Sequence, residues 1–240
     1  MTRRLPDVVL TVVAVELSLV IVGVVRTPAA LTGSGGWALA GVVVVQAACA
    51  LASRRGPVSV GRAPAAVITV GVIVGSVTGA LYAAEAVAEY VSPALTRAST
   101  PVGYLIVAAI VASACVAGAV GARRGGSWRA GLVSAVWNAI AEYLVWYPPI
   151  LIAYYAFSGT AAQDRVFRAE GFYDDFHRSG MTDLHAFVMQ DFLGAGLFHL
   201  LAGMVIAVVF GSAAAAIAGA VHPRARSAAE QPRRSAPRSQ

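Results

Sequence analysis

Lysine is absent from this chain of 240 residues, and charged side chains make up only 12% of it. Without lysine the chain has neither a Walker-type phosphate loop nor a retinal Schiff base, because both depend on a lysine amine. A soluble domain usually carries about 25% charged residues. Hydrophobic residues make up 58% of the chain and the mean hydropathy is +0.71, so the composition predicts a membrane protein.

Cysteines and catalytic motifs are also scarce. Cys49 and Cys115 are the two cysteines, and both fall inside apolar stretches without forming a CxxC pair. This arrangement argues against a cysteine-rich metal site or a thiol redox role. The sequence lacks the H-E-x-x-H motif of zinc proteases and the G-x-S-x-G motif of α/β-hydrolases. We therefore assign no catalytic residue, cofactor or metal from the sequence, and a non-enzymatic function is favoured.

Six long apolar stretches account for most of the chain. A helix needs about 20 mostly apolar residues to cross the hydrocarbon core of a bilayer. The predicted membrane spans are 8–25, 37–52, 65–90, 101–122, 130–158 and 191–220. The pattern predicts an all-α protein, a polytopic membrane helix bundle with six transmembrane helices that forms one domain over residues 1–221.

The 18 basic residues are all arginines, and they are distributed unevenly between the predicted spans. Thirteen of them fall at the N-terminus, in the second and fourth connections and in the C-terminal tail, against five in the other three connections. Cytoplasmic loops collect Lys and Arg. The asymmetry predicts a multi-pass protein of the cell membrane, with both termini cytoplasmic and the connection 159–190 on the extracytoplasmic side.

Residues 222–240 consist mainly of Ser, Ala, Pro, Gln and Arg, with almost nothing to bury. A segment of this composition is predicted to be disordered, which makes it an Arg-rich cytoplasmic tail. Its charge is explained by the orientation of the chain and by contact with anionic lipid headgroups. We therefore expect the lipid bilayer, and no nucleic acid, as the partner of the tail.

The connection 159–190 is the one long polar segment between the predicted spans. Asp and Glu residues alternate there with Phe and Tyr, a composition typical of the membrane interface. Thr182, directly before Asp183, resembles a helix N-cap, which would start the last helix ahead of the membrane. Two interpretations stay open: a solvated hairpin with an interfacial helix, and a lid over a site.

Small residues recur at helical spacing in the third and fourth spans. Such residues let helix backbones approach closely within a bilayer, so we assign them to helix packing. The two stripes are Gly71, Gly75 and Gly79 in the third span, and Ala108, Ala112, Ala114 and Gly118 in the fourth.

Two adjacent prolines, Pro148 and Pro149, lie in the fifth span. Proline removes a backbone donor, so the pair predicts a kink or a break in the helix. In transporters a broken helix often marks the substrate site. We favour the simpler interpretation, a kink near the outer interface.

The ionisable residues within and at the edges of the spans are the main functional signal. A charge at the bilayer centre costs roughly 2.5–3.5 kcal/mol or more, so such residues normally face the bundle interior. No arginine lies in the middle of a span. A proton, a metal ion or an organic amine is then the natural partner of these acids. The predicted substrate- or ion-binding residues are Glu16, Glu85, Glu89, Glu142, Asp191 and His199.

Spacing indicates how these six residues are grouped. Glu85 and Glu89 share one helix face, and we expect them to converge with Asp191 and His199 near the extracytoplasmic mouth. Glu16 and Glu142 lie deeper in their spans, and His199 could lie close to them in the bundle. For these three residues a functional polar cluster and a structural network of interhelical hydrogen bonds both remain open.

Together these features favour a small transporter, or the membrane-embedded subunit of one, that handles a cationic or proton-coupled solute. Two other classes stay open. One is a non-catalytic membrane scaffold that assembles with another membrane protein. The other is an intramembrane enzyme, metal-dependent through its Glu, Asp and His side chains.

Overall fold

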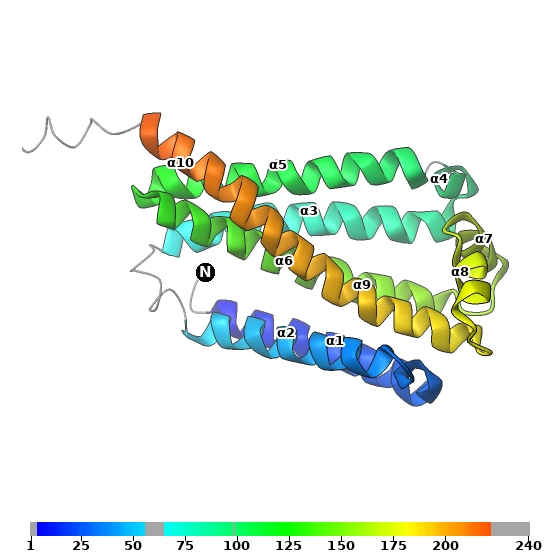
Figure 1. The fold of residues 1–240 in the computed structure, drawn as a ribbon. Coiled ribbons are helices and arrows are strands. Elements are labelled where there is room, and N and C mark those ends of the chain that lie inside the picture. The colour runs from blue at the N-terminus through cyan, green and yellow to red at the C-terminus, as the bar shows by residue number, and fades with distance from the viewer. Residues whose placement is uncertain (1–3, 56–64, 98, 222–240) are drawn as a thin grey trace, which may run out of the picture.

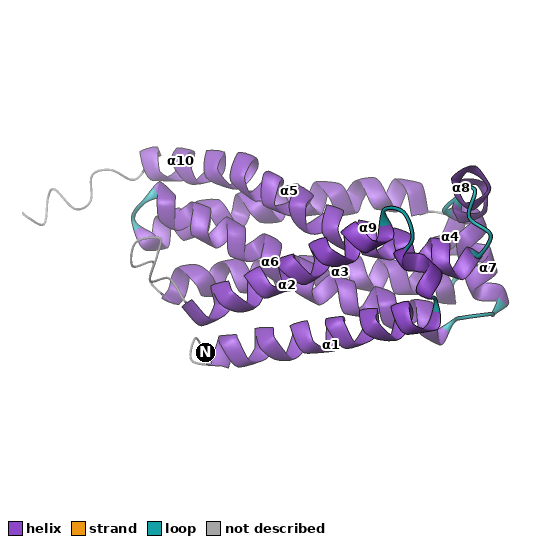
Figure 2. Ribbon diagram, turned by 60° about the horizontal axis from the view of Figure 1, so that its bottom comes forward, coloured by secondary structure: helices purple, strands orange, loops and turns teal. Residues whose placement is uncertain are grey.

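The computed structural model describes residues 4–55, 65–97 and 99–221, so the predicted disordered tail, 222–240, lies outside the described residues. Every element in the described ranges is a helix, which confirms the all-α prediction. The long helices run side by side along one axis (Figures 1 and 2). The chain starts at the end of the bundle where α10 finishes, and α4, α7 and α8 lie together at the opposite end (Figure 1).

The described part of the chain consists of α-helices, a short 3₁₀ helix and a π-helical turn. The order is α1 (Leu5–Arg26), η2 (Pro28–Leu31), α2 (Gly35–Arg55), α3 (Ala65–Val91), α4 (Pro93–Arg97), α5 (Ser99–Gly125), α6 (Trp128–Ala156), α7 (Ala161–Ala169), α8 (Phe172–Ser179), α9 (Leu184–Ile206), η4 (Ala207–Gly211) and α10 (Ser212–Val221).

Five helical segments are long and apolar enough to cross a membrane. They match five of the six predicted spans, with ends shifted by a few residues in most cases. This makes the chain a candidate multi-pass membrane protein. The five segments are Leu5–Arg26, Gly35–Arg54, Ala65–Val91, Pro101–Gly125 and Leu184–Ala220.

The remaining predicted span, the fifth (130–158), corresponds to α6, which has 29 residues but is not among those five segments. Its sequence includes Arg129, Asn138 and Glu142 beside several Trp and Tyr residues. All residues from Trp137 to Leu144 are buried, and two turns of unbroken burial mean that protein surrounds the helix. A helix enclosed by other helices does not need an apolar outer face, so polar residues are tolerated in it.

The prolines do not break α6. The helix continues through Pro148 and Pro149 to Ala156 without interruption. Pro148 and the nearby Leu151 are buried, so neighbouring helices hold the chain on both sides of the missing donors. Of the two outcomes predicted for this pair, a broken helix is wrong.

The glycines of α3 bring its backbone against the backbone of α6. A Cβ atom added at Gly75 would collide with the main chain at Asn138, and Gly71 and Gly79 stand against α6 in the same way one turn to either side. This confirms the packing role predicted for the stripe. Because α3 and α6 touch through their backbones, side chains flanking the glycines are held at fixed positions across the interface.

The second stripe of small residues packs only in part. Gly118 of α5 lies against the backbone of Gly211, and Ala114 is buried beside it. Ala108 and Ala112 are exposed on the outer face of α5. The packing interpretation is therefore confirmed for Ala114 and Gly118 and wrong for the other two.

The last long helix begins seven residues before its predicted span. Asp183 is its N-cap, and one carboxylate oxygen accepts hydrogen bonds from the amides of His185 and Ala186 at 2.9 and 3.1 Å. The predicted cap, Thr182, is one residue too early. Within the same helix, η4 is a π-helical turn that joins α9 to α10 without a break in the ribbon (Figure 1).

The polar connection folds into two short helices, α7 and α8, at one end of the bundle (Figure 2). Phe167 of α7 is buried and its ring lies 5.0 Å from that of Phe172. On the outside, Arg168 donates two hydrogen bonds to Asp164, and Tyr173 donates a third at 2.7 Å. These bonds, led by those from Arg168, hold the pKa of the Asp164 carboxyl below its ordinary value. The connection is therefore an ordered cap with a buried aromatic side.

The α3–α6 contact predicts that a glycine-to-alanine substitution destabilises the protein at Gly75 but not at Gly194. Gly75→Ala places a methyl group against the main chain of α6 and should lower the free energy of unfolding by about 1–3 kcal/mol. Gly194→Ala on α9 meets no atom within 4 Å and should be neutral or stabilising, by up to about 1 kcal/mol, through helix propensity. Thermal melting of both purified variants in one detergent checks this. Equal melting temperatures would show that the α3–α6 backbone contact is unimportant.

Candidate functional site

Two adjoining cavities lie between α3, α5, α6 and α9. The outer cavity, of about 520 Å³, is walled by α3, α6, α7 and α9 and opens toward the capped end of the bundle. The inner cavity, of about 550 Å³, lies deeper between α3, α5, α6 and α9. Tyr82, Gly103 and Trp146 line both cavities, so these three residues form the boundary between them.

The outer cavity gathers four carboxyl groups and no basic side chain among its lining residues. The acids are Glu85 and Glu89 of α3, Asp191 of α9 and Glu170 at the end of α7. Glu85 and Glu89 were expected to converge with Asp191 and His199. Asp191 lines this cavity together with the two glutamates, whereas His199 lines the inner cavity. Glu170 was not among the predicted site residues. It belongs to the acidic connection 159–190, for which a solvated hairpin and a lid were both left open, and the fold of α7 brings it to the other three acids.

Arg165 of α7 extends toward the C-terminal end of α3, but it does not bind the described acids there. It donates hydrogen bonds to the carbonyl of Tyr90 at 2.9 Å and to the hydroxyl of Thr96 at 3.4 Å. Within the described residues, the two ion pairs are Arg168–Asp164 and Arg178–Asp175, and both lie in the cap. The acids of the outer cavity thus have no arginine partner among the described side chains.

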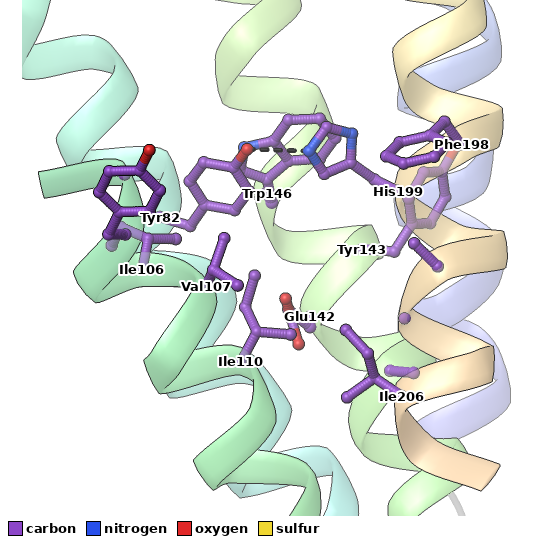
Figure 3. A pocket seen from close by; sticks show the side chains of 15 residues that line it. Tyr82, Ile106, Val107, Ile110, Glu142, Tyr143, Trp146, Phe198, His199 and Ile206 are labelled. Carbon is purple, nitrogen blue, oxygen red and sulfur yellow. Dashed lines mark hydrogen bonds between the residues drawn. The ribbon is translucent and has the colours of Figure 1, made fainter. Parts of the chain in front are cut away.

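His199 projects from α9 into the inner cavity and is held at both ring nitrogens. Nδ1 lies 2.8 Å from the carbonyl oxygen of Ala195, and Nε2 lies 2.8 Å from the hydroxyl of Tyr82 (Figure 3). A carbonyl can only accept, so Nδ1 carries the proton. In the neutral ring Nε2 then accepts from Tyr82. His199 therefore positions the Tyr82 ring, and both of its ring nitrogens take part in hydrogen bonds.

Three rings form a continuous aromatic wall on one side of the inner cavity. The rings of Tyr82 and Trp146 stack with centroids 4.9 Å apart, and the rings of Trp146 and His199 lie 4.2 Å apart. Figure 3 shows this row above Glu142. Stacking turns part of each ring face toward a neighbouring ring. Aromatic ring faces that remain free carry negative partial charge and attract cations.

Glu142 is the carboxyl group of the inner cavity. Its side chain is only 8% exposed, and its Oε2 atom is buried without a hydrogen-bond partner among the described residues. In Figure 3 the carboxyl lies between the aliphatic side chains of α5 and Ile206 of α9. Five other described side-chain atoms are buried without a partner as well, among them Nε1 of Trp146 in the same cavity. A buried acceptor without a donor is costly, and either a proton on the carboxyl group or a cation beside it offsets that cost.

Glu16 lines neither cavity, so the structure does not bring it together with Glu142 and His199. Its fully buried carboxyl accepts a hydrogen bond from the amide of Gln46 on α2. The same amide donates to the hydroxyl of Tyr143 at 3.1 Å. Since Tyr143 also lines the inner cavity, Glu16 stands behind the cavity wall in a network that joins α1, α2 and α6. Of the two interpretations left open for Glu16, this arrangement fits a structural network of interhelical hydrogen bonds.

Among the residues that the structure describes, no group of three or more His, Cys, Asp and Glu side chains is arranged to hold a metal ion. The donors of the inner cavity are one carboxylate and aromatic rings. This combination suits an organic ammonium group better than a divalent metal, which prefers several oxygen or nitrogen ligands. The binding roles of the six predicted residues stay predictions.

No protein-family description, curated protein or solved structure matches this chain. The geometry of the two cavities is therefore the basis for a functional proposal.

The network around Glu16 predicts non-additive effects on stability. Gln46→Leu leaves the Glu16 carboxyl buried without its donor and should lower the free energy of unfolding by about 1–3 kcal/mol. The double variant Glu16→Leu/Gln46→Leu removes both polar groups and should recover much of that loss. Chemical denaturation of the wild type, the two single variants and the double variant measures the coupling. Strictly additive losses would contradict a direct Glu16–Gln46 interaction.

Proposed function

We propose that this protein is a small membrane transporter, or the membrane-embedded subunit of one, that carries a cationic or proton-coupled solute. It crosses the cell membrane six times, with α6 as the enclosed fifth span and both termini in the cytoplasm. The arginine asymmetry supports this orientation. The even number of spans is supported by the arrangement in Figure 1, where α1 begins and α10 ends at the same end of the bundle.

The observation that supports the transport proposal is that the buried Glu142 carboxyl and the three side chains of the aromatic wall line one cavity, which adjoins a second cavity lined by four acids. In this proposal the outer cavity faces the extracytoplasmic side. Its four carboxyl groups raise the local concentration of cations, because a cleft lined by one sign of charge focuses its field. The inner cavity then binds one cation between Glu142 and the aromatic wall of Tyr82, Trp146 and His199.

The proposed orientation predicts which sites a membrane-impermeant thiol reagent reaches. In a Cys49→Ala/Cys115→Ala background, a cysteine at Ser179, at the end of α8, should be labelled in intact cells. A cysteine at Ser227, in the tail, should be labelled only after the membrane is permeabilised. The two positions serve as controls for each other. The reverse labelling pattern would show that the proposed orientation is wrong and that both termini are extracytoplasmic.

The transport role predicts that ionisation of Glu142 matters more than its volume. Glu142→Gln keeps the size and most of the polarity of the side chain but cannot carry charge, so uptake of a cation into proteoliposomes should fall at least tenfold while the melting temperature changes little. Radiolabelled tetramethylammonium and a pH-sensitive dye inside the vesicles report cation and proton movement. Glu142→Leu tests the structural alternative. If Glu142→Gln retains full uptake while Glu142→Leu only lowers the melting temperature, a scaffold is the better interpretation.

A further inference from the structure

The inner cavity is larger and more apolar than a simple cation requires. It measures about 550 Å³, whereas a trimethylammonium group, taken as about five water-sized units, needs on the order of 150 Å³. Apart from Glu142 and the aromatic wall, its lining is mostly aliphatic, with Ile106, Ile110 and Ile206 among the contributors, and the rest includes Tyr104, Tyr143 and Phe198. The remaining volume suits hydrocarbon rather than water.

The same cavity reaches the outer surface of the bundle between α5 and α9. Its rim includes Tyr104 and Val107 of α5 and Phe198 of α9, which are 74%, 56% and 66% exposed. These three side chains lie on helices that are long and apolar enough to span a membrane. Surface of that kind faces lipid, so the opening leads sideways into the bilayer. Tyr104 stands near the start of its span, at the depth where tyrosines mark the membrane interface.

The two cavities thus offer opposite chemistries on either side of one boundary. On the capped side are four carboxyl groups without a described basic partner, and on the lateral side is an apolar mouth. Glu142 and the aromatic wall lie between the two. A molecule that matches both sides has a cationic head and a hydrocarbon tail.

We infer that the substrate is an amphipathic organic ammonium compound whose head binds at Glu142, Tyr82 and Trp146 while its alkyl chain leaves through the mouth between α5 and α9. This inference rests on the proposed transport function and adds the substrate class and the route of entry. The positive charge of the head is attracted by the Glu142 carboxylate, and its methyl groups lie against Tyr82 and Trp146. The tail enters from the lipid and needs no passage through water.

The test compares two probes on the full-length protein in lipid nanodiscs, with empty nanodiscs subtracted to remove partition into lipid. The probes are radiolabelled tetramethylammonium and decyltrimethylammonium, and equilibrium dialysis gives their dissociation constants. Decyltrimethylammonium should bind at least tenfold more tightly, because each buried methylene contributes a factor of about four. Glu142→Gln should weaken both probes at least tenfold.

Two matched variants on α5 test the lateral mouth. Val107→Trp places a large ring at the rim and should weaken decyltrimethylammonium at least tenfold while leaving tetramethylammonium within twofold. Val116→Trp is the control, since Val116 is 49% exposed on the same helix and lines neither cavity. It should leave both probes within twofold. Melting temperatures of all variants show that each is folded.

The possible outcomes distinguish failure of the amphipathic-substrate inference from failure of the cation-transport proposal on which it rests. If neither probe binds the folded wild type, the cation-transport proposal itself fails, and this inference fails with it. If tetramethylammonium binds in a Glu142-dependent way but the decyl chain adds no affinity, the transport proposal stands and the amphiphile is wrong. If Val107→Trp and Val116→Trp affect the decyl probe equally, the lateral route is wrong.

Discussion

The contact between the backbones of α3 and α6 is the constraint on which both cavities depend. Gly71, Gly75 and Gly79 leave no side chain between the two helices. Tyr82, one turn after Gly79 on α3, therefore lies directly beside the turns of α6 that carry Glu142 and Trp146. A wider spacing would separate the Tyr82 ring from Trp146, and the boundary between the acidic and the aromatic cavity would open.

The placement of α6 explains how one chain combines an apolar exterior with a polar interior. The other long helices turn aliphatic residues outward, as the exposed Ile21, Ile73 and Val205 show. They shield α6, which can then hold Asn138 and Glu142 at depth. Asn138 is satisfied in part by donating to Ser113 at 3.1 Å. The Oδ1 atom of Asn138 and the Oε2 atom of Glu142 both lack a partner among the described residues. What distinguishes Glu142 is that it lines the inner cavity, whereas Asn138 does not.

Periodic features were predictable from the sequence, and features that depend on distant partners were not. The spacing of Gly71, Gly75 and Gly79 predicted a tight helix contact, because the pattern is local. The apolar stretches predicted all six long helices, including α6 as the span 130–158, although α6 has a weaker apolar signal than the other five. The grouping of Glu85, Glu89 and Asp191 was predicted from helical phase, whereas the separation of Glu16 from Glu142 depends on which face α1 turns toward α2. Glu170 was missed, since only the fold of α7 brings it into the outer cavity.

The π-helical turn η4 changes the phase of the last helix. One extra residue in a turn rotates everything after it by about 100° relative to a continuous α-helix. Upstream of the turn, His199 and Gly203 face the inner cavity. Downstream, Ala215 and Ala218 are buried against α5. Because of this turn, α9 and α10 present different faces to their neighbours. A substitution on the cavity-facing side of α9 therefore need not change how α10 packs against α5.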